Sequence, residues 1–157
     1  MKRGIVFVLL VSTLLCLLCS CTPYEDAVLD SLGAYKSYEF YTEGYFQDYT
    51  DYAKYYFESV DFTDNEYFYE VEPSDLDVLN EHLDNFESWI ETFRNYDPTM
   101  EIVVNYDFDR SLIDNEDYWH IDSEIYIRDG GYRWLTNYDI YFFDIQTNTL
   151  YYFHNNI

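Results

Sequence analysis

The chain has 157 residues, and its 31 Asp and Glu against 8 Lys and Arg give a formal net charge of −23. This length allows one domain or two very small ones. The excess of carboxylates argues against nucleic-acid binding, which needs clustered Lys and Arg opposite phosphates. It also argues against docking on anionic lipid through charge, which needs basic clusters.

The N-terminus carries the pattern of an export signal. Lys2 and Arg3 precede an apolar run from Ile5 to Leu18, which only one Ser and one Thr interrupt. The run has the length of a signal-peptide core, and it is short for a membrane span, which needs about 20 apolar residues. The sequence therefore predicts an exported protein.

The apolar run ends in Leu18-Cys19-Ser20-Cys21. This end resembles the bacterial lipobox, in which a Leu lies three residues before an invariant Cys and a small residue lies directly before it. The resemblance implies a bacterial lipoprotein, with residues 1–20 removed as a signal peptide and lipid attached to Cys21. The protein would then lie outside the cytoplasm, anchored to the cell membrane by that lipid. An uncleaved anchor and an ordinary cleaved signal remain the alternatives.

The aromatic content indicates that the rest of the chain folds. High net charge with few apolar residues predicts disorder, but the chain contains 20 Tyr, 12 Phe and 3 Trp. Such rings can each bury about 150–250 Å². We expect a short tether over residues 21–36 and an acidic, Tyr-rich domain over residues 37–157. Within the tether, Val28, Leu32 and Tyr35 have helical spacing.

Two helices are expected first in this domain. Over residues 37–60, tyrosines recur in steps of four, four, three and four, which predicts an amphipathic helix. Core packing explains these rings better than a ligand-stacking face does. Over residues 74–95, apolar residues alternate three and four steps after Ser74, which can cap the helix start, and the pattern ends before Pro98. The tyrosines are Tyr41, Tyr45, Tyr49, Tyr52 and Tyr56, and the second stripe includes Leu79, Leu83, Phe86 and Ile90.

After the second helix the apolar period changes to two, which is the period of strands. Alternation over residues 102–108 and 118–127, followed by a hairpin over 138–154, predicts four strands. Asp129-Gly130-Gly131 marks a turn. The predicted fold is therefore α+β, a single small domain in which two N-terminal helices precede a four-stranded, mostly antiparallel sheet.

The last two predicted strands are apolar on both faces, so each face needs a cover. The helices can cover one face. The other face is either covered by the chain or left as an exposed aromatic surface, which would mark a binding site. The rings of that candidate surface are Tyr141, Phe143, Tyr151 and Phe153.

The best candidate for ion binding is the segment that contains Asp107, Asp109 and Asp114. Hard oxygen ligands at alternate positions suit Ca²⁺. The segment resembles the start of an EF-hand loop, but Leu112 stands where that loop needs Gly and Tyr118 where it needs a bidentate Glu. A strand end with a polar turn is therefore the favoured interpretation, and we expect no other cofactor.

No catalytic motif is present in the sequence. A Gly-rich phosphate loop, a Gly-x-Ser-x-Gly elbow and a His-Glu-x-x-His pair are all missing. His82, His120 and His154 are far apart and lack ligand spacing, so each is expected at the surface or with its hydrogen bonds satisfied. Carboxylate pairs are too common among 31 acidic residues to indicate a glycosidase. We therefore expect a protein that is not an enzyme.

The sequence favours a lipid-anchored extracytoplasmic binding or interaction protein. Aromatic faces suit glycan or peptide ligands, and an acidic field suits a cationic protein partner. Two alternatives remain open. One is a cell-wall hydrolase that uses a carboxylate pair, and the other is an immunity-type lipoprotein whose acidic surface binds a cationic partner.

Overall fold

The computed structural model describes residues 26–45, 48–128 and 132–156. The chain divides into two compact units, residues 1–31 and 32–157. In the first unit, the short helix α2 (Ala27–Asp30) is capped by Asp26, whose carboxylate accepts hydrogen bonds from two backbone N–H groups at 3.0 Å. The other described elements belong to the second unit. The predicted lipobox with Cys21 and the turn predicted at 129–131 lie outside the described residues.

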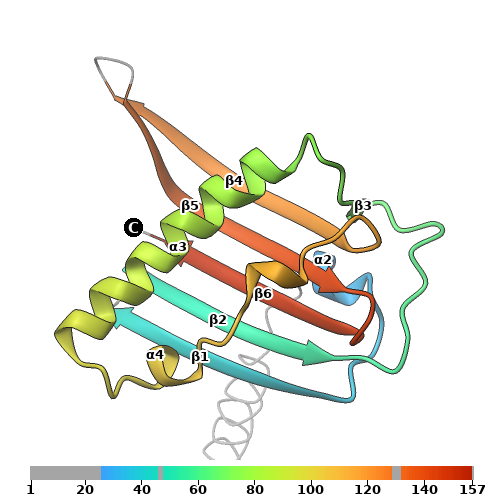
Figure 1. Cartoon of the computed structure of the whole chain (residues 1–157), viewed down its shortest axis with the longest axis horizontal. Helices are drawn as coiled ribbons and strands as arrows, with labels where there is room; N and C mark the ends of the chain where they lie inside the picture. The colour runs from blue at the N-terminus through green and yellow to red at the C-terminus, as the bar shows by residue number, and fades with distance from the viewer. Residues whose placement is uncertain (1–25, 46–47, 129–131, 157) are drawn as a thin grey trace, which may run out of the picture. The chain divides into compact units, whose positions relative to one another are not determined.

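The second unit is built on a six-stranded antiparallel sheet (Figure 1). Its strands are β1 (Ser37–Tyr45), β2 (Asp48–Tyr56), β3 (Tyr69–Glu70), β4 (Tyr118–Arg128), β5 (Tyr132–Asp144) and β6 (Thr149–Asn156). They lie in the order β1-β2-β6-β5-β4-β3, so β6 is inserted between β2 and β5. Because successive side chains alternate along each strand, the sheet has two distinct faces.

One face of the sheet is covered by α3 (Leu76–Tyr96), which crosses the strands (Figure 1). After it come the short helix α4 (Glu101–Asn105) and the 3-10 turn η1 (Arg110–Leu112). The core between α3 and the sheet includes Leu79, Leu83, Phe86 and Ile90 of the helix and Tyr52, Ile140, Phe142 and Phe153 of the strands. Within the part of the chain that the structure describes, no helix has both the length and the apolar character to cross a bilayer.

The opposite face of the sheet is partly covered by residues 57–68, the segment that joins β2 to β3. Phe62 packs edge-on against Phe143 with ring centroids 5.0 Å apart, and Phe68 packs against Tyr141 at 6.4 Å. These contacts help to bury Tyr141 and Phe143. Both faces of the sheet therefore contribute to packing, as its two-sided apolar strands require.

The helix predicted over residues 37–60 is wrong, because this segment forms the β1–β2 hairpin. Tyr41 and Tyr52 are direct cross-strand partners with stacked rings 6.4 Å apart. Near the turn, Gly44 has a φ of +144°, and a Cβ there would collide with the carbonyl oxygen of Asp48. Aromatic side chains also favour strands where they can pack on cross-strand neighbours, and this packing overrides the helical spacing.

The predicted arrangement of a four-stranded sheet after two helices is also wrong. The hairpin and β3 add three strands, while the strand expected over residues 102–108 contains α4 instead. The adjacent residues Ile102 and Val103 of α4 are both buried. Neighbouring residues of a strand point to opposite faces, whereas neighbouring residues of a short helix can both face the core. The helix expected over 74–95 is confirmed as α3, and the last three predicted strands are confirmed as β4, β5 and β6.

Candidate functional site

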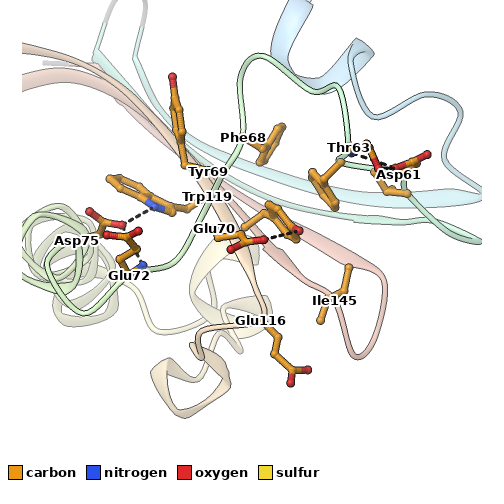
Figure 2. A pocket seen from close by; sticks show the side chains of 13 residues that line it. Asp61, Thr63, Phe68, Tyr69, Glu70, Glu72, Asp75, Glu116, Trp119 and Ile145 are labelled. Carbon is orange, nitrogen blue, oxygen red and sulfur yellow. Dashed lines mark hydrogen bonds between the residues drawn. The ribbon is translucent and has the colours of Figure 1, made fainter.

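A groove of about 980 Å³ opens beside the β3–β4 edge of the sheet (Figure 2). It lies between the segment that joins β2 to β3, the start of β4 and the residues just before α3. Its lining residues are Val60, Asp61, Phe62, Thr63, Phe68, Tyr69, Glu70, Glu72, Asp75, Glu116, Tyr118, Trp119 and Ile145. Aromatic rings and carboxylates predominate in this lining, and it contains no Lys or Arg.

The aromatic rings of the groove are held in place by stacking and by hydrogen bonds. Phe62 lies parallel to Tyr118, with ring centroids 3.9 Å apart. The indole Nε1 of Trp119 donates a hydrogen bond to Asp75 Oδ2 at 3.3 Å (Figure 2). Tyr69 of β3 stays 63% exposed. A ligand therefore meets ring faces that are already ordered, so little side-chain entropy is lost on binding.

The carboxylates of the groove are also positioned by neighbouring groups. The hydroxyl of Tyr118 donates to Glu70 at 3.3 Å, and Asp61 accepts from the hydroxyl of Thr63 at 2.6 Å and from its backbone N–H at 3.0 Å. The hydrogen bonds from Thr63 hold the pKa of Asp61 below its ordinary value. Burial, with the charge of Glu70, raises the pKa of the Tyr118 hydroxyl. At neutral pH, Asp61 is thus ionised and Tyr118 remains a donor.

A second hollow of about 560 Å³ adjoins the groove between α3 and β4, and both include Tyr69 and Trp119 in their linings. Its lining also includes His82, which is 2% exposed and whose Nδ1 lies 2.8 Å from the carbonyl oxygen of Val78. Because a carbonyl oxygen only accepts, Nδ1 carries the proton and Nε2 of the neutral ring is an acceptor. Among the described residues, this buried Nε2 has no hydrogen-bond partner.

The outer edge of β4 runs beside the second hollow. β3 pairs only with the first two residues of β4, and the same ladder continues with a hydrogen bond from the Val71 N–H to the Asp117 carbonyl at 2.9 Å. In an antiparallel ladder, every second residue of a strand turns its N–H and C=O groups to the same side. Ile121 and Ser123 therefore turn these groups to the same side as Asp117, away from β5. No strand of the described ranges pairs with that part of β4 on its outer side. The edge therefore offers backbone donors and acceptors to an added strand.

The structure does not bring the three candidate calcium ligands together. Asp107 accepts hydrogen bonds from Lys54 and Tyr52, both at 2.8 Å. Asp109 caps η1 at 2.9 Å, and Asp114 accepts from an amide side chain of the β5–β6 turn at 2.9 Å. Within residues 26–45, 48–128 and 132–156, no three or more His, Cys, Asp or Glu side chains are arranged to hold a metal ion.

The four rings of the predicted aromatic surface are divided between the two faces of the sheet. Tyr141 and Phe143 lie on the face away from α3, whereas Tyr151 and Phe153 lie on the face that packs against it. Tyr141 is 5% exposed, and Phe143 and Phe153 are fully buried. These four side chains therefore do not form one shared surface, and three of them belong to the packed interior.

The histidines differ from one another in their surroundings. His120 Nδ1 lies 2.9 Å from the backbone carbonyl of Tyr67, which agrees with a hydrogen-bonded histidine. His82 and His154 are buried, and the Nε2 of each is without a partner among the residues that the structure describes. The expectation of a surface or satisfied histidine is therefore not met at these two positions.

None of the groove residues was among the predicted site residues. The local signal is the run over residues 61–75, in which carboxylates and aromatic rings are interleaved. Trp119 joins this run only because β3 pairs with β4, which no local pattern indicates. Since acidic and aromatic residues occur throughout the chain, composition alone does not single out the run.

No protein-family model matches the chain, and no curated protein or solved structure matches it either. The groove is therefore the feature of the described residues that bears most directly on function. Its distinguishing property is a set of carboxylates around ordered rings, without a basic residue to neutralise them.

Proposed function

We propose that the protein is a lipid-anchored extracytoplasmic binding protein whose groove captures an extended, basic segment of a partner polypeptide. The observation that carries this proposal is the groove lining, where five carboxylates accompany five aromatic rings and no Lys or Arg is present. Ammonium and guanidinium groups pair with carboxylates and also bind over the faces of aromatic rings. The groove therefore favours Lys and Arg side chains.

The charge of the whole chain supports a cationic partner at longer range. A formal net charge of −23 produces a field that speeds the encounter with a basic polypeptide and repels an acidic one. Salt weakens this long-range attraction. The carboxylates of the groove then decide where on the surface the basic segment binds.

The outer edge of β4 supports an extended conformation for the bound segment. A strand added in line with β3 would form hydrogen bonds with the backbone of Ile121 and Ser123. Alternate side chains of that strand would point into the second hollow, whose lining includes the carboxylate of Glu81 and the imidazole of His82. Main-chain hydrogen bonds would then supply affinity, and the hollow would select basic side chains.

The expected lipid on Cys21 supports the same function through location. Each buried methylene of a lipid chain contributes about 0.8 kcal/mol, and two or more chains suffice for stable anchoring. Anchoring raises the effective concentration of the domain for partners close to the membrane. Cys21→Ser should abolish lipid attachment without changing peptide binding, which mass spectrometry of the protein and a binding titration measure together.

Binding of a fluorescent Lys- and Arg-rich peptide, followed by anisotropy at low salt, tests the groove. Glu70→Gln/Glu72→Gln should lower the affinity about tenfold or more, which corresponds to about 1.4 kcal/mol. The matched variant Glu101→Gln/Glu124→Gln removes the same charge from exposed positions outside the groove lining. That control should stay within about threefold of the unmodified protein, because its two carboxylates lie outside the groove and act on the peptide only through the long-range field.

Equal losses of affinity in the two double variants would contradict the groove as the binding site, because only the net charge would then matter. An acidic peptide of the same length serves as the negative ligand. A basic peptide with a methyl group on every backbone nitrogen tests the strand addition, since it offers β4 no N–H group in either register. Unchanged affinity for that peptide would rule out pairing with β4.

A further inference from the structure

A separate hollow of about 270 Å³ lies between the C-terminal half of α3 and the turn end of the β1–β2 hairpin, next to the end of β6. It has no lining residue in common with the groove. Trp89 and Phe93 of α3 provide its apolar wall, and Thr50 and Asn155 of the central strands provide polar groups. A ligand can therefore bind in this hollow without occupying the groove.

Asn155 is the buried polar group of this hollow, and it is only 1% exposed. The hydroxyl of Thr50 donates to Asn155 Oδ1 at 2.8 Å, so the carbonyl end of this amide already has a partner. Its Nδ2 is buried and has no hydrogen-bond partner in the described ranges. An unsatisfied buried donor costs about 1–3 kcal/mol. A ligand that brings an acceptor oxygen to Nδ2 would remove this cost.

The apolar wall presents ring faces one helical turn apart. Trp89 and Phe93 have ring centroids 6.2 Å apart, as expected for positions i and i+4 of a helix. Both side chains are only half-buried. The large indole of Trp89 therefore offers a flat surface on which the C–H groups of a ring-shaped ligand can pack.

Glu43 and Asp48 add carboxylates to the same hollow. Glu43 already accepts a hydrogen bond from the backbone N–H of Gly44 at 3.2 Å, and this bond uses only part of its accepting capacity. Ionised carboxylates accept hydrogen bonds and do not donate them. They can therefore accept from donor groups of a ligand, whereas Asn155 Nδ2 needs an acceptor.

A hydroxyl group meets both requirements, because it donates and accepts. An ammonium group has no acceptor for Asn155, and an anion would be repelled by the two carboxylates. The volume lies just below the range of about 300–1,000 Å³ that is typical of drug-sized ligands, which suits a single ring. We propose that this hollow binds one neutral sugar ring, with its hydroxyls bound by Asn155, Glu43 and Asp48 and its carbon face packed on Trp89.

Two-dimensional ¹⁵N–¹H NMR of the full chain in detergent reports on this site through the Asn155 amide group and the Trp89 indole N–H. The probes are methyl β-glucopyranoside, methyl β-galactopyranoside and N-acetylglucosamine, each titrated to about 100 mM so that millimolar Kd values are measurable. We expect at least one of them to shift both signals in a saturable way. Acetamide and butylammonium are the comparison ligands, since they carry an amide or a cation without a hydroxylated ring.

Two variants separate this site from the groove. Trp89→Leu should weaken sugar binding about fivefold or more, because the stacking surface is lost. Trp119→Leu, the same substitution in the groove, should leave the sugar-induced shifts of Asn155 unchanged while it weakens binding of the basic peptide. Because a substitution of buried Asn155 can disturb folding, Glu43→Gln at the rim is the second variant, and it should reduce sugar affinity with the fold intact.

Three outcomes would overturn the sugar proposal. The first is the absence of saturable shifts with every sugar probe. The second is a response of Asn155 to acetamide or butylammonium in place of the sugars. The third is sugar binding that Trp89→Leu does not change. None of these results affects the peptide proposal, which depends on Glu70, Glu72 and Trp119.

Discussion

Asp51 of β2 and His154 of β6 are direct cross-strand partners, yet Asp51 Oδ1 and His154 Nε2 are both buried with no hydrogen-bond partner among the described residues. Both residues are 7% exposed. The other ring nitrogen of His154, Nδ1, lies 2.8 Å from Asp139 Oδ1. Asp139 Oδ1 also accepts a hydrogen bond from the Tyr152 hydroxyl at 2.6 Å. An ionised Asp51 that is buried with one oxygen unpartnered is costly in the folded state.

Asp51→Asn should therefore raise the free energy of unfolding at neutral pH by about 1–2 kcal/mol. Burial raises the pKa of Asp51 above its ordinary value, although a hydrogen bond from Thr42 acts in the opposite direction. The asparagine removes the buried charge, and its amide group can donate or accept a hydrogen bond at this position. Urea unfolding at pH 7 measures the change, with m-values compared to confirm that both proteins unfold alike.

The gain from Asp51→Asn should also depend on pH. The pKa of Asp51 is higher in the folded protein than in the unfolded chain, where it is about 3.9. The charged carboxylate therefore destabilises the fold increasingly as the pH rises from about 3.9 through the pKa of the folded state. The advantage of the variant should disappear below about pH 4. Asp48→Asn, at an exposed position of the same strand, is the matched control and should change stability by less than about 0.5 kcal/mol. Destabilisation by Asp51→Asn at every pH would show that the carboxylate has a favourable partner.

Lys54 links β1 and β2 to the segment after α4. Its Nζ lies 3.0 Å from Glu39 and 2.8 Å from Asp107, and its side chain is 10% exposed. Lys54→Met should lower the free energy of unfolding by about 2 kcal/mol, because two carboxylates then lose their shared cation. Lys36→Met, at an exposed lysine, should have an effect within about 0.5 kcal/mol. Equal effects of the two substitutions in urea unfolding would contradict a specific role for Lys54.

The contribution of Lys54 should decrease in acid. The hydrogen bond from Lys54 lowers the pKa of Glu39. Burial raises the pKa of Asp107, but hydrogen bonds from Lys54 and Tyr52 outweigh it, so its pKa also lies below the ordinary value. Stability from such carboxylates is present above their unfolded pKa of about 4 and is lost as pH falls through the folded value. The difference between wild type and Lys54→Met should therefore shrink below pH 4. A constant difference down to the lowest pH at which both proteins fold would assign the effect to packing of the lysine stem.

The glycine near the turn of the β1–β2 hairpin should not tolerate a side chain. Gly44→Ala should destabilise the protein by at least about 2 kcal/mol, because its positive φ is strained for alanine and its Cβ would collide with the Asp48 carbonyl. Gly33 has a φ of +80°, but no atom lies within 4 Å of an added Cβ. Gly33→Ala should therefore show only the smaller conformational cost. Thermal unfolding of both variants measures the two losses of stability. Equal losses would contradict a collision at Gly44.

The packing of α3 on the sheet gives a direct test of the fold. Phe86 is fully buried and lies 5.2 Å from Phe153 of β6 between ring centroids. Phe86→Ala should cost about 3–5 kcal/mol, since it leaves a cavity in the core. Leu76, at the start of the same helix, is 37% exposed, so Leu76→Ala should cost about 1 kcal/mol or less. Similar losses of stability for Phe86→Ala and Leu76→Ala, measured by calorimetry, would mean that α3 does not pack on the sheet through Phe86.

The sequence predicts an element well where its apolar residues keep one spacing, helical or alternating, along the whole element. The apolar spacing of α3 continues over about six turns and ends near Pro98, and β4 to β6 alternate with a period of two. The β1–β2 segment misleads because Tyr41, Tyr45, Tyr49, Tyr52 and Tyr56 have steps that satisfy a helix. In the hairpin, Tyr41 and Tyr52 are the one pair of these tyrosines that lie directly opposite each other. Pairing of β2 with β6, which no local pattern indicates, also favours the extended conformation.

The candidate site was harder to predict than the fold. The groove combines residues 61–75 with Trp119, and the sugar hollow combines Trp89 with Asn155, so each depends on contacts between distant segments. Buried atoms without partners, such as Asn155 Nδ2, become visible only when the packing is known. The acidic pattern around Asp107 suggests a calcium site, but hydrogen bonds from Lys54 and Tyr52 account for that carboxylate.

The central position of β6 has a consequence for how the protein folds. The hydrogen bond between Thr50 and Asn155 joins residues that are 105 positions apart, so a long loop must close before β2 and β6 gain any contact. The hairpin of β1 and β2 and the antiparallel run of β4, β5 and β6 are local and can form early. Their joining is expected to limit the folding rate, on the millisecond-to-second scale of non-local β topologies. Until that step, the tyrosine-rich inner faces of both halves are open to water, and dilute refolding should give a higher yield than concentrated refolding.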